Sequence, residues 1–450
     1  MGYRTALMAV FSAVLAAGAG HDPEEVLKRV TARILAAGKR IPNYTCVEAV
    51  QRDYFQPAAA TLPRACPLVI EERRHPGLAM VLRPALTDRL HLDVAMVHLD
   101  VAMVQGGEIF SWVGASKFDD AGIFDLVRFG PIATGAFAGY LVVIFEQDVK
   151  TFTFTREIVA GGRSLIEYSF QVASAHSHYK VRAGDSWFYI GYSGTIQVDP
   201  ETDEVVRLTV RTADLPEAAN SCETLTSLDF GMAHIGGVDF PLPTRSRQRF
   251  VIPDGEEVEN TTTFANCREY KGESTITFDE TAPAADGAAP AADPTPRNGR
   301  SRAPSPRPSV PENRRFTLEL TAPIQTDTVA AGDPFTARLA MPLRDAKGKL
   351  LAPAGTPVAG RLLRVEIFHK SPQEVILALK PDTMDIKGVK VPLAAVRDWS
   401  QIVAAARNSR KRGVKILLPL KGEEHAGVFQ FPGEHPVVKK GFRSDWRTVR

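Results

Sequence analysis

The residue types that could do chemistry in this 450-residue sequence are histidines with acidic neighbours. His176 and His178 stand two apart in a stretch predicted to be a strand, so both would face one side and could share a metal ion. No third ligand stands near them in the sequence, which favours an ordinary polar face. A second group is predicted to be surface-loop residues: His425, His435, Glu423, Glu424 and Glu434. The sequence therefore predicts no metal site.

Catalytic motifs of specific spacing are missing from the sequence, which has no GxSxG, HExxH or P-loop pattern. Asp119 and Asp120 could act as paired carboxylates, but their place before an apolar segment favours a role as helix caps. We therefore predict no catalytic residue and no cofactor, and we expect the protein not to be an enzyme. An envelope hydrolase stays as a third alternative to the two functions considered below.

The N-terminus has the pattern of a secretory signal peptide. Arg4 precedes an apolar run over residues 5–17, and small residues at positions 17 and 19 suit cleavage after Ala19. The run is shorter than the roughly 20 residues that a membrane-spanning helix needs, so export is favoured over a membrane anchor. We expect a mature protein that is periplasmic or associated with the outer envelope.

Four cysteines follow in the mature sequence: Cys46, Cys66, Cys222 and Cys267. An even number in an oxidising compartment predicts two disulfides, for which three pairings are possible. Proximity along the chain favours Cys46–Cys66 and Cys222–Cys267. No CxxC spacing occurs, which argues against a zinc ribbon or a thioredoxin-like site.

Composition narrows the class of protein. The 44% hydrophobic content is that of a globular chain, and 450 residues predict two or three domains. The net charge of +2 argues against a dedicated nucleic-acid binder, which would be far more basic.

The elements that must position any site are mostly strands. A helix is predicted to begin at Pro23, with Asp22 as its N-cap, and to end at Gly38. Residues from about 43 to 278 alternate as strands do, with a hairpin over 194–210 and a meander after it. The apolar residues 118–145 predict a helix pair packed on the sheet, with a transmembrane span as the alternative.

Residues 91–97 and 98–104 are the same seven residues, HLDVAMV. Two copies are fewer than the three or four heptads of a coiled coil. Residues 101–104, a turn at Gly106 and Gly107, and residues 109–112 predict a hairpin that contains the second copy. Because seven is odd, one straight strand would turn the two copies to opposite faces. A bulge, bend or looped-out copy must absorb the shift, and we expect one copy to be an insertion without a role of its own.

The chain divides into a signal peptide at 1–19, a curved-sheet domain with an N-terminal helix at 20–280, a linker at 281–314 and a small β-barrel or sandwich at 315–450. The linker is dense in Pro, Ala and Arg, and it has too few large apolar residues to bury a core. Basic residues gather near the C-terminus, where a solvated face is favoured over contact with an anionic envelope surface: Arg407, Arg410, Lys411, Arg412, Lys415, Lys439, Lys440, Arg443, Arg447 and Arg450.

The stretch WFYIGYSGTIQVDPETDEVVRLTV, followed by LTSLDFGMAHIGGVDFPLPTRS, resembles the lipoprotein-sorting carriers and related LolA/RseB-like periplasmic proteins. The resemblance covers residues 42–278. It implies a strongly curved antiparallel sheet that wraps helices and encloses an apolar groove for acyl chains. Residues 132–145 are the suspected groove segment, with a core helix or strand as the alternative, and no further ligand-binding residue is predicted.

The second domain resembles the β-barrel module of type IV secretion and conjugation channel subunits, the TrbI-like family, over residues 316–396. The membrane-spanning insertion of that family is missing, so channel assembly is not implied. The residues that carry this resemblance are predicted to be structural: Gly332, Asp333, Phe335, Ala337, Leu339, Pro353, Gly355, Thr356, Val358, Gly360 and Arg361.

Two functions follow. The preferred one is an exported, non-enzymatic envelope protein whose N-terminal domain binds a lipid or a lipoprotein acyl chain. The alternative is a scaffolding protein without a small ligand, which docks to an envelope protein through its C-terminal barrel. Neither involves nucleic acid, and the oligomeric state stays open.

Overall fold

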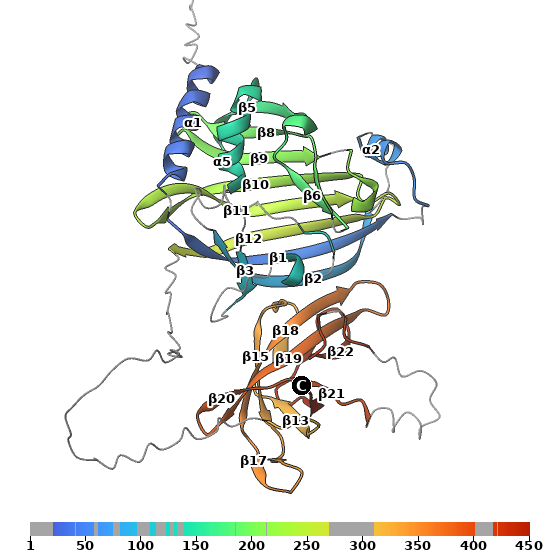
Figure 1. The fold of residues 1–450 in the computed structure, drawn as a ribbon. Coiled ribbons are helices and arrows are strands. Elements are labelled where there is room, and N and C mark those ends of the chain that lie inside the picture. The colour runs from blue at the N-terminus through green and yellow to red at the C-terminus, as the bar shows by residue number, and fades with distance from the viewer. Residues whose placement is uncertain are drawn as a thin grey trace, which may run out of the picture.

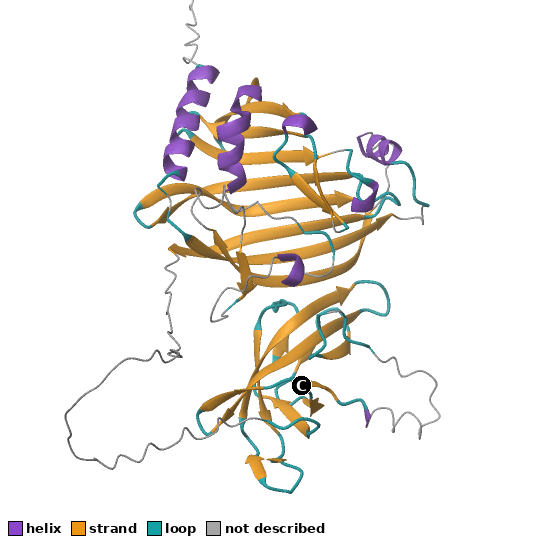
Figure 2. Cartoon of the chain, in the orientation of Figure 1, coloured by secondary structure: helices purple, strands orange, loops and turns teal. Residues whose placement is uncertain are grey.

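The computed structural model describes residues 21–40, 42–57, 62–74, 82–96, 109–113, 123–126, 130–132, 139–184, 186–212, 214–269, 310–400, 417–420 and 422–450. Four predicted features lie outside these residues: the signal peptide, Asp119 and Asp120, the second heptad copy at 98–104, and residues 281–309 of the linker. So do the basic residues from 407 to 415. The described chain is mainly β, as predicted (Figure 2). It has two large hydrophobic cores.

The N-terminal unit is one curled antiparallel sheet (Figure 1). Its strand order is β4-β5-β8-β9-β10-β11-β12-β1-β2-β3, so the first strands of the chain pair beside the last strand of the unit. The strands are β1 (Tyr44–Pro57), β2 (Leu82–Met96), β3 (Ile109–Trp112), β4 (Thr153–Ala160), β5 (Arg163–Val172), β8 (Tyr192–Asp199), β9 (Glu204–Thr212), β10 (Glu223–Ile235), β11 (Val238–Val251) and β12 (Glu257–Glu269). The predicted hairpin is β8–β9, and the predicted meander is β10–β11–β12.

Helices cover one face of this sheet, which is its concave face (Figure 2). The Asp22 side chain accepts a hydrogen bond from the Glu24 backbone nitrogen at 3.0 Å, so the first helix begins where the sequence predicts. Its buried stripe of Val26, Val30 and Ile34 has helical spacing and packs on the sheet. The helices are α1 (Pro23–Gly38), α2 (Cys66–Arg74), α4 (Ile123–Leu126), α5 (Gly139–Val143), the π-helical turn η2 (Ile144–Asp148) and the 3-10 turns η3 (Val149–Thr151), η4 (Ser174–His176) and η5 (Glu217–Ala219).

Two disulfides cross-link the unit, but the pairing differs from the one that proximity favoured. Cys46 pairs with Cys267, and Cys66 pairs with Cys222. The physical reason is the strand order: β1 lies directly beside β12, which brings Cys46 and Cys267 together although 221 residues separate them. The second bond fastens α2 to the start of β10. In a sheet whose first strand lies beside its last strand in the sequence, two cysteines can be neighbours although they are far apart along the chain. Distance along the chain therefore does not predict which cysteines pair.

The duplicated heptad also departs from its prediction. The first copy lies in β2, and Leu92, Val94 and Ala95 pair with Trp112, Phe110 and Ile109 of β3. The prediction that the second copy forms this hairpin was therefore wrong. Residues 97–104 lie outside the described residues. Identical copies give identical local signals, so the pattern could not choose which one pairs with β3.

The C-terminal unit is a second curled antiparallel sheet, ordered β21-β24-β13-β15-β18-β19, with β20 and β22 both pairing with β19. Val365, Leu377 and Trp446 are buried in its core. Its strands are β13 (Arg315–Leu320), β14 (Ile324–Gln325), β15 (Pro334–Leu339), β16 (Leu343–Arg344), β17 (Leu350–Ala352), β18 (Pro357–Phe368), β19 (Glu374–Ile386), β20 (Val389–Pro392), β21 (Ala395–Arg397), β22 (Gly427–Pro432), β23 (Val437–Val438) and β24 (Arg443–Thr448).

The two units meet along a strand edge. Glu366, Ile367 and Phe368 of β18 pair with residues 86–88 of β2, so the two sheets are continuous (Figure 1). Arg361 donates a hydrogen bond to the carbonyl oxygen of Val113 at 2.7 Å. In the part of the chain that the structure describes, no helix is long and apolar enough to cross a bilayer.

Candidate functional site

The candidate site is the concave face of the N-terminal sheet, which has an apolar half and a polar half. The apolar half lies on β5, β8 and β9, beneath α1 and α5. Alternation along each strand turns every second side chain to this face, where it is buried. The buried side chains of this wall are Ile166, Tyr168, Phe170, Tyr192, Ile196, Val198, Leu208 and Val210.

Aromatic rings join the roof of α5, η2 and η3 to this wall. Phe152 stacks on Phe170 with ring centroids 5.2 Å apart, and Phe145 packs edge-on to Phe152 at 5.7 Å. Gly194 lies opposite Phe170 on β8, and a Cβ there would come within 2.6 Å of the Phe170 ring. The wall therefore admits an aromatic ring only because that position is glycine.

Three tyrosines close the end of the wall. The rings of Tyr140, Tyr179 and Tyr192 lie 5.7 to 6.1 Å from one another, centroid to centroid. The Tyr192 hydroxyl donates a short hydrogen bond to the buried carboxylate of Asp148 in η2. Burial raises the pKa of all three phenols above the ordinary value. They stay protonated at neutral pH, and Tyr192 uses its proton to donate to Asp148 inside the apolar wall.

The polar half lies on β11, β12 and β1. Arg52 on β1 is buried, and its Nε donates to Asn260 Oδ1 on β12 at 2.9 Å. Ser246, Gln248 and Thr262 are buried on the same face. Among the described residues, Ser246 Oγ has no hydrogen-bond partner. The floor of this half therefore offers hydrogen bonds, unlike the wall.

Residues 130–132, which we call the strap, cross this polar half. The Pro131 carbonyl oxygen accepts from Arg52 Nη2 at 3.0 Å and from Asn260 Nδ2 at 2.9 Å. Gly130 has φ of +67°, and a Cβ there would come within 2.6 Å of Tyr54 Oη and 2.8 Å of Arg52 Nη1. Only glycine fits both the conformation and the space. Arg52 and Asn260 thus fasten the strap to the sheet.

Of the strap, only Ile132 lies in the segment predicted to line the groove. Gly130, Pro131 and Arg52 were not predicted, although the sequence contains a signal for Arg52. Cys46, Val50, Arg52 and Tyr54 stand at even spacings on one strand, so a charged residue falls in phase with buried neighbours. An arginine in that phase has to find hydrogen-bond acceptors inside the protein. Asn260 and the strap supply them, from positions far along the chain.

The predicted chemistry-bearing residues lie elsewhere. His176 ends the 3-10 turn η4, and His178 follows it outside any strand, so the prediction that both share one strand face was wrong. His176 and His178 are exposed. The described residues contain no cluster of three or more His, Cys, Asp or Glu side chains that could hold a metal ion.

The second predicted group lies in the C-terminal unit. Glu423 is buried and pairs with Arg364 at 2.8 Å, so its prediction as a surface-loop residue was wrong. Glu434 pairs with His369 at 3.1 Å. Two members of the predicted basic group near the C-terminus are paired with acids. Arg443 pairs with Glu319 and Arg450 with Glu312, each at 2.8 Å, so their charges are partly neutralised.

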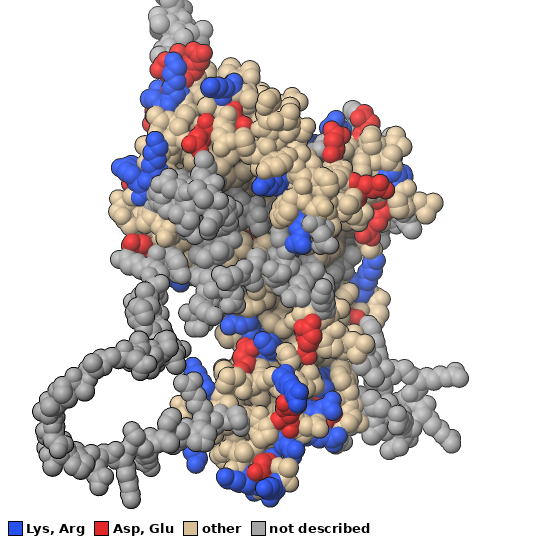
Figure 3. Space-filling model, in the orientation of Figure 1, with Lys and Arg blue, Asp and Glu red and all other residues tan. Residues whose placement is uncertain are grey.

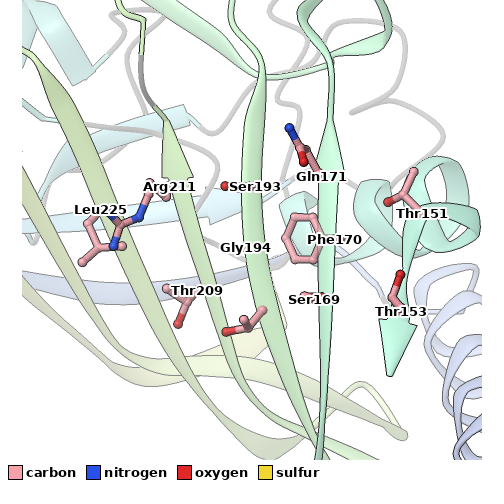
Figure 4. Close-up of a pocket in the computed structure, with 11 residues that line it drawn as sticks. Thr151, Thr153, Ser169, Phe170, Gln171, Ser193, Gly194, Thr209, Arg211 and Leu225 are labelled. Carbon is pink, nitrogen blue, oxygen red and sulfur yellow. The ribbon is translucent and has the colours of Figure 1, made fainter. Parts of the chain in front are cut away.

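A hydroxyl-lined pocket of about 520 Å³ lies on β5, β8 and β9, and its side chains alternate with those of the apolar wall (Figure 4). Ser169, Thr195 and Thr209 stand in register across the three strands, beside Gln171 and Arg211. Arg211 is held by Glu223 at 2.8 Å. This outer pocket is lined by polar and apolar surface in similar amounts, so an acyl chain would find fewer apolar contacts there than on the buried wall. The concave face is the better candidate for an apolar ligand.

No protein-family model and no curated protein sequence matches this chain. A solved LolA superfamily protein from Nitrosomonas europaea overlays on it with a TM-score of 0.25 and 8% identity, covering 55% of this chain and 94% of that chain. A DUF1329 family protein from Desulfovibrio piger overlays with a TM-score of 0.26 and 10% identity, covering 56% of this chain and 96% of that chain. TM-scores this low carry no argument about what the chain binds.

The N-terminal unit has the architecture that the resemblance implied, a curled antiparallel sheet with helices on its concave face. The apolar groove for acyl chains that the resemblance also implied stays a prediction. The TrbI-like resemblance of the C-terminal unit stays a prediction.

Proposed function

We propose that this chain is an exported, non-enzymatic envelope protein that binds the acyl chain of a lipid or lipoprotein on its concave face. The observation that carries the proposal is the division of that face into a buried apolar wall and a polar floor crossed by a fastened strap. An amphiphile needs both surfaces, one for its chain and one for its head. The two disulfides support export, because such bonds persist in oxidising compartments.

The apolar wall supplies the affinity. Each Å² of apolar ligand surface removed from water contributes about 25 cal/mol. The wall is now covered by α5 and η2, whose Leu141, Ile144 and Phe145 are fully buried. A ligand chain would take the place of these side chains, so entry requires the roof to move.

The roof is the part of the unit best suited to move. The helical run of α5, η2 and η3 covers residues 139–151 and changes from α- to π- to 3-10-helical hydrogen bonding, whereas α1 has sixteen residues of one type and a capped start. A run of this length with two such changes has little stability apart from its packing. We expect α5 to lift while α1 stays in place.

Arg52 and Asn260 control the strap. Their two hydrogen bonds to Pro131 must break before residues 130–132 can leave the floor. A hydrogen bond to a charged group contributes about 1.5–3 kcal/mol, so the closed form is favoured but not permanent. Once the strap leaves, the same donors are available to the polar head of a ligand.

Native mass spectrometry of the mature chain, purified from an oxidising periplasm, tests the proposal. We expect a protein mass with a stoichiometric lipid adduct, and solvent extraction then identifies its class. A matched variant, Arg156→Ala on the exposed face of β4, should retain the adduct. A clean apo mass that does not change after incubation with envelope phospholipids would contradict the carrier and favour the scaffold.

A further inference from the structure

The hairpin of β6 (Lys180–Ala183) and β7 (Ser186–Tyr189) exposes large aromatic side chains on a short ribbon apart from the main sheet. Trp187 is 54% exposed, Phe188 38% and Tyr189 57%. Such residues normally dominate buried cores, and an exposed apolar cluster marks an interaction site. Nothing in the core requires these three rings at the surface.

The two faces of the ribbon differ. Strand alternation places Trp187 and Tyr189 on one face, and their direct partners across the ribbon are Arg182 and Lys180. Lys180 Nζ lies 5.1 Å from the centre of the Tyr189 ring, a cation–π contact. One face therefore presents two aromatic rings alternating with two cations.

We propose that this aromatic-basic face docks the protein on an anionic phospholipid bilayer. Trp and Tyr are the side chains enriched at the headgroup level of membranes, where a ring can be buried while its polar atom stays wet. Lysine and arginine beside them attract anionic headgroups. From 173 to 198 the sequence holds one acid, Asp185, against Lys180 and Arg182, so the segment is net cationic.

The size of the ribbon argues against a protein partner. Each strand has four residues, so the face is about 13 Å long at 3.3 Å per residue. A stable protein interface needs about 800 Å² from each partner, more than such a ribbon offers. In Figure 3 the surface over β6 is largely uncharged with Lys or Arg side chains at its margin, a pattern that a bilayer interface accepts.

The hairpin is built onto the candidate site. Tyr179, which precedes β6, belongs to the tyrosine cluster, and its carbonyl oxygen accepts from the Ile190 backbone nitrogen at 3.0 Å. Ser177 Oγ donates to the Ile190 carbonyl oxygen at 2.5 Å. Both ends of the ribbon are thus fixed next to the apolar wall. Docking here would hold the wall close to the membrane from which a ligand comes, and to this extent the inference rests on the proposed function.

Vesicle sedimentation with the intact mature chain tests the inference. The vesicles contain equal parts of phosphatidylethanolamine and phosphatidylglycerol, with pure phosphatidylcholine vesicles for comparison. We expect binding to the anionic vesicles and a blue shift of the tryptophan emission. In the Trp187→Ser/Tyr189→Ser variant we expect no blue shift and a loss of about tenfold or more in affinity. Phe154→Ser removes an aromatic residue that is 47% exposed on β4, and this control should bind like the parent.

Equal binding by the parent and the double variant, or no binding to either vesicle, would overturn the inference. So would a photoreactive residue at position 187 that crosslinks to protein and never to lipid. The vesicle assay needs no ligand in the concave face. Docking without any carried lipid would sink only the proposed function, and carried lipid without docking would sink only this inference.

Discussion

At the scale of single residues, Arg52 is the side chain on which closure of the concave face depends. Arg52→Ala removes the donor to the Asn260 Oδ1 atom and one of the two donors to the Pro131 carbonyl oxygen, which keeps its bond from Asn260. We expect a loss of about 2–3 kcal/mol in the free energy of unfolding and faster uptake of a fluorescent fatty acid. Urea titration and stopped-flow fluorescence measure the two effects.

The control for Arg52 is Arg207→Ala on β9, which breaks a pair with Asp229 whose two side chains are 49% and 39% exposed. Such pairs contribute about 0–1 kcal/mol, so this variant should match the parent in both measurements. Uptake that is unchanged in Arg52→Ala would mean that the strap does not limit access to the face.

Glu319 gives the C-terminal unit a pH dependence. Hydrogen bonds from Arg338, and then from Arg443, hold the pKa of Glu319 below its ordinary value. The unfolded chain has the ordinary pKa of about 4.3 and binds the proton first as the pH falls. The stabilisation is therefore complete above that value and is lost as the pH drops through the lower, folded pKa.

We expect the urea midpoint of the C-terminal unit to fall between about pH 5 and pH 3, and Glu319→Gln to flatten that part of the profile. In a Trp112→Phe/Trp187→Phe background, the emission that remains comes from Trp399 and the buried Trp446, which both belong to this unit. A variant profile parallel to the parent's would show that other carboxylates carry the acid sensitivity.

At the scale of elements, the Cys46–Cys267 bond joins neighbouring strands that are 221 residues apart in sequence. Replacing both cysteines with serine removes the cross-link that closes this loop in the unfolded chain, so the unfolded chain gains conformational entropy. We expect a loss of about 2–5 kcal/mol in the free energy of unfolding. Peptide mapping of the parent under non-reducing conditions should recover Cys46 with Cys267 and Cys66 with Cys222.

The second disulfide fixes the helix α2 to the sheet, so removing it tests the stability of that helix rather than of the sheet. Cys66–Cys222 holds α2, whose one fully buried side chain is Val69. Removing this bond should expose α2 to proteolysis more than it lowers the global midpoint. Equal losses from the two double variants would mean that α2 unfolds together with the sheet.

The duplicated heptad gives another prediction at this scale. Deleting residues 91–97 or 98–104 yields the same protein, in which the remaining copy can pair with β3 as the first copy does now. The connection from β2 to β3 shortens from twelve residues to five, which favours folding by about 0.8 kcal/mol in closure entropy. Thermal unfolding of the deletion variant should match or exceed the parent's. A loss of soluble protein would show that the extra copy has a role.

At the scale of the whole molecule, the C-terminal unit covers an edge that would otherwise be open. The pairing of β18 with β2 involves three residues of each strand. A contact this short depends on the predicted linker between the two units, which we call the tether, because a flexible linker gives each unit an effective concentration in the millimolar range at the other. After cleavage at a protease site placed near residue 295, we expect the two halves to separate at micromolar concentration in gel filtration. Co-elution of the halves would mean that the contact is strong enough to hold alone.

The sequence predicts local structure well and long-range pairing poorly. The capped helix at Pro23, the β8–β9 hairpin and the meander depend on neighbours in the chain, and all are present. The insertion of β1 between β12 and β2 depends on contacts across more than 200 residues. The disulfide pairing and the Arg52–Asn260 contact both follow from that insertion, so both were missed.

The place where the tether leaves the first sheet has a mechanical consequence. The chain toward the C-terminal unit departs at the end of β12, two residues beyond Cys267. Tension along the tether would otherwise peel β12 from β1 one backbone bond at a time, beginning at the pair of Tyr44 and Glu269. The Cys46–Cys267 disulfide lies next to this pair, so it would stop the separation of the strands at its start and transmit the force to β1 through a covalent bond. Force between the two units would then leave the N-terminal sheet intact, as long as that bond stays oxidised.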